Sequence, residues 1–185
     1  MNQSKTAVLT PAGMIHEGVV TQTLWIAAFA GLTAIGAQIE IPHVPVPFTL
    51  QTFFVLLAGA FLGRRNGAIS QLAYLAAGAA GLPVFSHFGF GFVKLIGPTG
   101  GYLLEFPVAA FVIGYILENH KNFSWSLVAM TAGLFVIFSL GTLQLYLTYF
   151  RDLGKAIAGG FLIFSFFDLA KLVAAAGIFS RVAKK

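Results

Sequence analysis

Long stretches without a charged side chain constrain this sequence more than any other feature. Residues 41–63, 66–93, 106–117 and 122–150 contain no Asp, Glu, Lys or Arg. Over the whole chain of 185 residues, 9% are charged and 58% are hydrophobic, whereas roughly 25% of an average soluble domain is charged. Because a helix of about 20 mostly apolar residues crosses a bilayer, the sequence predicts an all-α integral membrane protein.

The apolar runs divide into six predicted transmembrane helices, at residues 19–37, 49–62, 67–82, 102–117, 123–149 and 156–180. The run at 49–62 is too short to cross alone at about 1.5 Å per residue. We therefore expect it to borrow the proline-rich segment IPHVPVPF, residues 41–48. The gaps between runs are short, which predicts one membrane domain over residues 1–185, with a cytosolic tail at about 1–18 and a basic tail at 181–185.

The distribution of basic residues predicts the orientation of the chain. Six spans with the amino terminus inside place seven basic residues in the cytosol, namely Lys5, Arg64, Arg65, Lys121, Arg181, Lys184 and Lys185. Three others, Lys94, Arg151 and Lys155, face outward. This excess satisfies the positive-inside rule, so we expect both termini to be cytoplasmic. The proline-rich segment, the glycine-rich loop at 82–102 and the start of the last helix then lie on the outer side.

Several function classes find no support in the sequence. The net charge of +5 comes from basic residues scattered between apolar runs, which argues against a nucleic-acid surface. The chain has no cysteine, and its histidines show no metal-ligand spacing: His16, His43, His87 and His120. No stretch reads G-x-x-x-x-G-K-[ST], so the chain carries no P-loop ATPase of its own.

An aspartate and a lysine interrupt the last apolar run, in SFFDLAKLVAAAG at residues 165–177. Either charge costs about 2.5–3.5 kcal/mol at the centre of an isolated membrane helix. At a spacing of three, Asp168 and Lys171 share one helix face and partly neutralise each other. The pair either holds helices together or binds a ligand, the carboxylate accepting N–H groups and the ammonium meeting an anion or carbonyl.

Small residues recur along the first predicted helix at a spacing of four, as Ala27 with Gly31 and Ala30 with Ala34. Such spacing lets helices approach closely in lipid. The stripe serves either internal packing or the docking of another membrane protein, and the pattern leaves both alternatives open.

Four motifs together resemble the BioY family, the biotin-binding S components of bacterial energy-coupling factor (ECF) transporters. In chain order they are IPHVPVPFTLQTFFVLLAGAFLG at 41–63, GLPVF at 81–85, GPTGGYLL at 97–104 and DLAK at 168–171. The resemblance covers nearly the whole chain, and P-V-P-F-T-L-Q-T with G-P-T-G-G-Y is its specific part.

The resemblance implies a six-helix S-component fold that captures biotin at the outer side of the bacterial plasma membrane. It implies no enzymatic activity and no cofactor, since biotin would be the transported ligand. The implied partners are an EcfT-like transmembrane coupling protein and two cytosolic ABC-type ATPase subunits, in agreement with the missing P-loop. It also gives Ala30 and Ala34 an expected role in docking the coupling protein.

The resemblance further implies a substrate-binding site. We expect it to include Gln51, Phe85, His87, Thr99, Tyr102, Asp168 and Lys171. Biotin has two ureido N–H donors, a carbonyl, an apolar bicycle and a carboxylate, so Asp168 is expected to accept from the ureido group. Lys171 is expected to bind either the ureido carbonyl or the carboxylate, and the sequence leaves this choice open.

The chain departs from the family pattern at three places. Ser165-Phe166-Phe167 stands where Pro-Gly commonly precedes the aspartate, Glu105 replaces a small residue, and His87 stands where an amide side chain is expected. Two other function classes remain as alternatives. One is a structural or assembly subunit with Asp168 and Lys171 as a helix-holding pair. The other is an intramembrane enzyme with Asp168 as base, for which no second catalytic group is evident.

Overall fold

The structure is a computed structural model that describes residues 18–162 and 165–183. The predicted tail at 1–18 therefore lies almost entirely outside the described residues, as do Lys184 and Lys185. The elements in chain order are α1 (Val19–Gln38), β1 (Glu40–Ile41), β2 (Phe48–Thr49), α2 (Gln51–Ala79), η1 (Ser86–Phe88), α3 (Val93–Ile96), α4 (Gly100–Leu104), α5 (Phe106–Leu117), α6 (Phe123–Leu145), η2 (Tyr146–Phe150), α7 (Leu153–Ile157), η3 (Ala158–Leu162) and α8 (Ser165–Val182).

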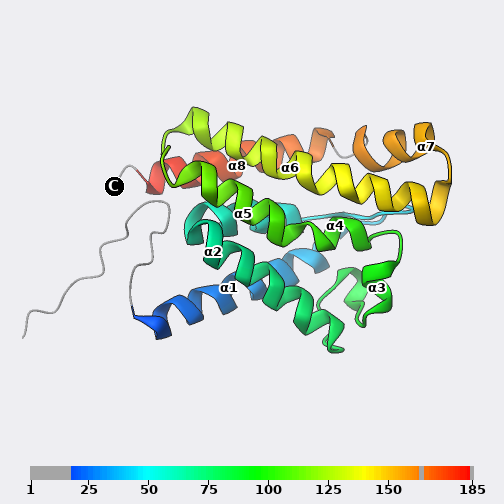
Figure 1. Ribbon diagram of the computed structural model, residues 1–185, viewed down its shortest axis with the longest axis horizontal. Coiled ribbons are helices and arrows are strands. Elements are labelled where there is room, and N and C mark those ends of the chain that lie inside the picture. The colour runs from blue at the N-terminus through cyan, green and yellow to red at the C-terminus, as the bar shows by residue number, and fades with distance from the viewer. Residues whose placement is uncertain (1–17, 163–164, 184–185) are drawn as a thin grey trace, which may run out of the picture.

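Helix α2 is the centre of the bundle (Figure 1). It packs against α1 on one side and α5 on another, and it also contacts α8. Helix α6 lies between α5 and α8, so that α6 and α8 form the edge opposite α1. The core is therefore built from α2, α5 and α6, whose inward faces are apolar and fully buried at positions such as Leu56, Ile113 and Ile137.

The prediction of a helical membrane protein is confirmed. Within the described residues, four helical stretches are long and apolar enough to cross a bilayer: Val19–Gln38, Gly100–Leu117, Phe123–Phe150 and Leu153–Val182. Helix α2 lacks this uninterrupted apolar character because Arg64 and Arg65 lie in its middle. The predicted count of six spans is therefore not confirmed by these lengths.

A kink divides α2 into the two runs that the sequence separates. Gly63 has φ 75° and ψ 178°, a conformation that glycine adopts without the strain of a side chain. The predicted basic turn at 63–66 is thus one non-helical residue, after which the helix resumes at Arg64. Gly114 of α5 lies directly against this kink, where any side chain would collide with the backbone of Arg64.

The proline-rich segment forms a hairpin between α1 and α2, in agreement with prolines that forbid a continuing helix. Strands β1 and β2 pair in antiparallel register, with Glu40 opposite Thr49 and Ile41 opposite Phe48. The prolines fall in the loop between them, where their missing N–H groups cost no ladder hydrogen bond. The hairpin brings the end of α1 next to the start of α2 at Gln51.

The last span is irregular just before its charged pair. Residues 158–162 form a π-helical turn, η3, a local distortion that often occurs at functional sites. Residues 163 and 164 lie outside the described chain, and α8 then runs from Ser165 to Val182. The polar interruption expected at 165–171 is therefore inside a continuous helix.

Candidate ligand-binding site

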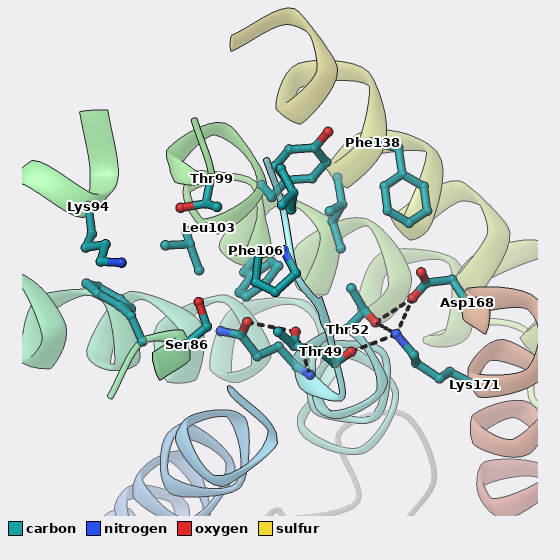
Figure 2. A pocket seen from close by; sticks show the side chains of 16 residues that line it. Thr49, Thr52, Ser86, Lys94, Thr99, Leu103, Phe106, Phe138, Asp168 and Lys171 are labelled. Atoms are coloured by element: carbon teal, nitrogen blue, oxygen red, sulfur yellow. Dashed lines mark hydrogen bonds and ion pairs between the residues drawn. The ribbon is translucent and has the colours of Figure 1, made fainter. Parts of the chain in front are cut away.

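A pocket of about 560 Å³, including its open part, lies where the hairpin, α2, the glycine-rich loop, α4–α6 and α8 meet (Figure 2). Its lining consists of Val46, Pro47, Thr49, Gln51, Thr52, Phe85, Ser86, Lys94, Thr99, Tyr102, Leu103, Phe106, Ile137, Phe138, Asp168 and Lys171. Residues 120 positions apart in the chain thus share one cavity.

The fold gathers six of the seven expected substrate-binding residues around this pocket: Gln51, Phe85, Thr99, Tyr102, Asp168 and Lys171. His87 does not line it. Its ring instead lies beside Glu40, with 3.0 Å between Nδ1 and Oε1, and its side chain is 58% exposed.

Asp168 and Lys171 form an ion pair on α8, with 2.8 Å between Nζ and Oδ1. The start of α2 completes a network around them. Thr52 donates its hydroxyl to the same Asp168 Oδ1 at 2.6 Å, and Lys171 Nζ lies 3.0 Å from Thr52 Oγ1 and 2.7 Å from the carbonyl oxygen of Thr49. An ammonium has three protons, so these three acceptors use all of them.

The second carboxylate oxygen of Asp168 has no such partner. Oδ2 is buried and accepts no hydrogen bond from any described residue, although Asp168 is 1% exposed and lines the pocket. A buried acceptor without a donor costs roughly 1–3 kcal/mol, and more when it is charged. The site therefore presents an oxygen that a ligand donor would satisfy.

Gln51 lines the pocket and belongs to a second chain of hydrogen bonds. Its side-chain amide donates to the hydroxyl of Tyr74 at 2.6 Å, and its amide oxygen accepts from the hydroxyl of Thr49 at 2.8 Å. Tyr74 in turn donates to the carbonyl oxygen of Val84 at 3.2 Å. This chain ties α2 to the glycine-rich loop and fixes the position of both walls.

Lys94 lies at the opposite end of the pocket from Asp168 and Lys171 (Figure 2). No described residue forms a hydrogen bond with its Nζ in the structure. The sequence alone predicts Lys94 only as a charge that faces outward. The available signal was its position inside the glycine-rich loop that also contains Phe85 and Thr99.

The walls between the two charged ends are mostly apolar. Leu103, Phe106 and Phe138 line them (Figure 2). The hydroxyl of Tyr102 points out of this wall and donates to the carbonyl oxygen of Gly160 at 2.9 Å. Through this bond α4 holds the π-helical turn that precedes α8.

Sequence reasoning also missed Thr52 and Ser86 as lining residues. Thr52 lies in the first turn of α2, whereas Thr49 belongs to β2 and reaches Lys171 through its backbone carbonyl oxygen. The signal in the sequence was the place of Thr52 at the end of the P-V-P-F-T-L-Q-T motif. Glu105 does not enter the pocket. It lines a separate, mainly apolar groove with Leu104, Leu140 and Gln144 on the other side of α4.

The small residues of α1 face two directions. Ala30 and Ala34, the expected docking residues, are partly buried and pack against the core. Ala27 and Gly31 are exposed, and a side chain at Gly31 would meet no atom within 4 Å. The outward part of the small-residue stripe is thus the Ala27–Gly31 pair.

The arrangement suits the binding of a small, largely apolar molecule with polar groups at both ends. Within residues 18–162 and 165–183, no three His, Asp or Glu side chains are placed to hold a metal ion. Fold and site together are those of a helical membrane protein with a pocket whose lining suits a small organic molecule.

Comparison with known proteins identifies the family. The BioY family model matches residues 3–185, and the chain belongs to this family of transporter components. A biotin transporter BioY from Thermotoga maritima is 48% identical over 156 residues, which cover 84% of this chain and 92% of that protein. A probable biotin transporter BioY from Pyrococcus horikoshii is 41% identical, with 85% and 93% covered.

A solved structure supports the same assignment. The crystal structure of the S component for biotin from an ECF-type ABC transporter matches with a TM-score of 0.83 and 26% sequence identity, covering 93% of this chain and 95% of that one. The mostly helical membrane fold is therefore that of an ECF S component.

Proposed function

We propose that this chain is the high-affinity biotin-capture subunit of an ECF-type vitamin uptake transporter. One observation above all supports the binding of biotin in the pocket: Oδ2 of Asp168 is buried in the pocket wall and has no hydrogen-bond partner among the described residues. A ureido N–H group of biotin is a donor that this oxygen lacks, and the contacts that Oδ1 makes with Thr52 and Lys171 hold the carboxylate in a fixed orientation.

Lys171 acts at the ureido end in this proposal. Its three protons are directed to Thr49, Thr52 and Asp168, so it serves first to compensate the charge of Asp168. A ureido carbonyl replaces one of these acceptors on binding. Of the two alternatives that the sequence leaves open for Lys171, we therefore favour the ureido carbonyl over the carboxylate.

Lys94 binds the biotin carboxylate at the other end of the pocket. Its position opposite Asp168 supports this orientation (Figure 2), as does the shortage of other cations in the lining. The bicycle and the aliphatic chain of biotin then lie against Leu103, Phe106 and Phe138, where apolar contact needs no polar partner. Gln51, Phe85, Thr99 and Tyr102 complete the substrate-binding residues.

We infer the topology from the kinked α2. Counting its two halves separately gives six spans within residues 1–185, with both termini cytoplasmic as the positive-inside rule requires. In this proposal the protein resides in the plasma membrane, and its pocket opens toward the outside of the cell. This orientation places the ligand entrance on the side where the vitamin arrives.

Transport requires partner chains. We propose an EcfT-like transmembrane coupling protein and two cytosolic ABC-type ATPase subunits, because the chain has no P-loop. The exposed Ala27–Gly31 face of α1 supports docking of the coupling protein there, with Ala30 and Ala34 at its inner border. Small residues allow a partner helix to approach closely.

The experiment that tests the function is a titration of the purified, folded subunit with biotin. Binding with a dissociation constant below 1 μM, about −8.2 kcal/mol, supports the proposal. A folded protein that binds no biotin at micromolar concentration overturns it.

A structural or assembly subunit is the second candidate function. One observation favours it: the Asp168, Lys171 and Thr52 network joins α8 to α2 without any ligand. Under this alternative, Asp168→Asn lowers the melting temperature while biotin has no effect on it. Stabilisation of the wild type by biotin, lost in the variant, excludes a purely structural role.

A further inference from the structure

Hydrogen bonds join the end of α1 to the turn at residues 85–89, which contributes two residues to the pocket. Gln38, the last residue of α1, donates its side-chain amide to the carbonyl oxygen of Phe85 at 3.0 Å. Its amide oxygen accepts from the backbone N–H of Phe88 at 3.1 Å. Phe85 and Ser86 of this turn line the pocket.

A second contact lies next to the first. Glu40, the first residue of β1, has Oε1 at 3.0 Å from Nδ1 of His87. A protonated Nδ1 donates across this distance in the charged ring and in one tautomer of the neutral ring. The Glu40 side chain is only 12% exposed, so the contact is shielded from water on one side.

The fastened turn is conformationally strained. His87 has φ 56° and Phe88 has φ 52°, and neither is a glycine. A left-handed conformation costs such residues about 1–2 kcal/mol each. Strained turns persist where surrounding contacts hold them, and Gln38 and Glu40 supply contacts to both residues.

The fastening also joins the two segments that cover the pocket. Strand β1 leads into the hairpin loop, whose Val46 and Pro47 line the pocket from one side. The turn at 85–89 lines it from another through Phe85 and Ser86. Loss of the Gln38 and Glu40 contacts would remove these links between the start of the hairpin and the turn, and would favour release of the strain in the turn.

We propose that Gln38 and Glu40 are positioning residues that hold the 85–89 turn closed over the bound ligand. The contacts of Gln38 with Phe85 and Phe88 and of Glu40 with His87 form a latch, and the opening of this latch limits the rate of biotin release. This proposal rests on the function proposed above. It gives His87 a role in ligand retention without ligand contact.

The test measures the dissociation rate of radiolabelled biotin from the purified subunit during a chase with unlabelled biotin. We expect Gln38→Ala, Glu40→Ala and His87→Ala each to raise this rate about tenfold, with a smaller change in the association rate. Glu40→Gln keeps an oxygen that accepts from His87 and should release biotin at nearly the wild-type rate. The double variant Glu40→Ala/His87→Ala should match the single variants, because both remove one contact.

The matched control is Glu118→Ala. It breaks a different ion pair, Arg64–Glu118 at 3.2 Å, at the end of α5 remote from the pocket residue Phe106. Its dissociation rate should equal that of the wild type. Melting temperatures of all variants separate loss of folding from loss of the latch.

Two results overturn the latch, and a third overturns the function on which it rests. One is a dissociation rate within twofold of wild type in both Glu40→Ala and His87→Ala. Another is an equal acceleration in Glu118→Ala, which would mean that any destabilisation has this effect. If the wild-type protein binds no biotin, the proposed function itself is wrong. If the wild type binds biotin but the variants release it at unchanged rates, only the latch is wrong.

Discussion

Thr52 of α2 donates a 2.6 Å hydrogen bond to Asp168 of α8, across 116 positions of sequence. The bond ends on the carboxylate oxygen that Lys171 also contacts. Both polar contacts of the carboxylate are thus made through Oδ1, and this leaves Oδ2 for the pocket.

Asp168→Asn should weaken biotin binding at least tenfold, about 1.4 kcal/mol. An amide removes the charge and can place an NH₂ group against the ureido donors. Isothermal titration of the purified variant measures the effect. Asp152→Asn is the matched control, since Asp152 caps α7 outside the pocket and asparagine also caps helices. Normal affinity in Asp168→Asn would contradict the ureido assignment.

Lys171→Ala should weaken biotin binding at least tenfold and also lower stability. The variant leaves a nearly buried carboxylate without its cation, which costs roughly 3–5 kcal/mol. The double variant Asp168→Ala/Lys171→Ala removes the orphaned charge, so its melting temperature should recover while biotin binding stays lost. Recovery of both properties would show that the pair has no part in binding.

Thr52→Val should reduce biotin affinity about tenfold while keeping the shape of the side chain. Valine deletes the donor to Asp168, and a hydrogen bond to a charged group contributes about 1.5–3 kcal/mol. Thr52→Ser restores the hydroxyl and should restore most of the affinity. Thr148→Val, which removes an exposed hydroxyl bonded to its own helix, should bind normally. Equal affinities of Thr52→Val and wild type would show that the carboxylate needs no such support.

Lys94→Ala should weaken binding of biotin about tenfold but change the affinity for biotin amide by less than twofold. The reason is that only biotin has the carboxylate that we place at Lys94. Competition titrations with both ligands give the comparison, and Lys155→Ala controls for loss of another outer positive charge. An equal loss of affinity for biotin and biotin amide would mean that Lys94 does not bind the carboxylate.

Gly31→Leu should abolish biotin uptake by cells while leaving binding by the isolated subunit intact. The added side chain meets no atom of this chain, so the fold tolerates it and only a docked partner is displaced. Ala30→Leu and Ala34→Leu should also block uptake, but with a lower melting temperature because both residues pack against the core. Uptake and copurification with the coupling protein are the measurements. Normal uptake in Gly31→Leu would remove this face from the docking surface.

The helical membrane class follows from the sequence because lipid permits few alternatives. A charge-free run such as 122–150 is far longer than the roughly 9–11 residues of a membrane-spanning strand, so in a bilayer it forms a helix whose backbone groups bond within the segment. The pairing of Asp168 with Lys171 follows equally, since residues three apart in a helix must lie side by side. Both features are local consequences of chain geometry.

The hairpin, by contrast, lay outside local reasoning. The prolines at 42–47 forbid a helix, yet pairing of Glu40 with Thr49 depends on α1 and α2 being adjacent. Likewise, the pattern of small residues in α1 does not say which pair faces outward. The packing of α1 on α2 turns Ala30 and Ala34 inward and leaves Gly31 exposed.

The sequence by itself determined that this protein belongs in a lipid bilayer, that it is helical, and that Asp168 and Lys171 form a charged pair within an apolar helix. Only the tertiary structure decided that Lys171 donates hydrogen bonds to Thr49 and Thr52 and that Lys94 lies at the far end of the pocket. It also decided that the His87 ring contacts the Glu40 carboxylate instead of lining the pocket. The physical reason is that apolar periodicity and charge act along a single segment. A binding site depends on which polar atoms are left without partners after all segments have packed.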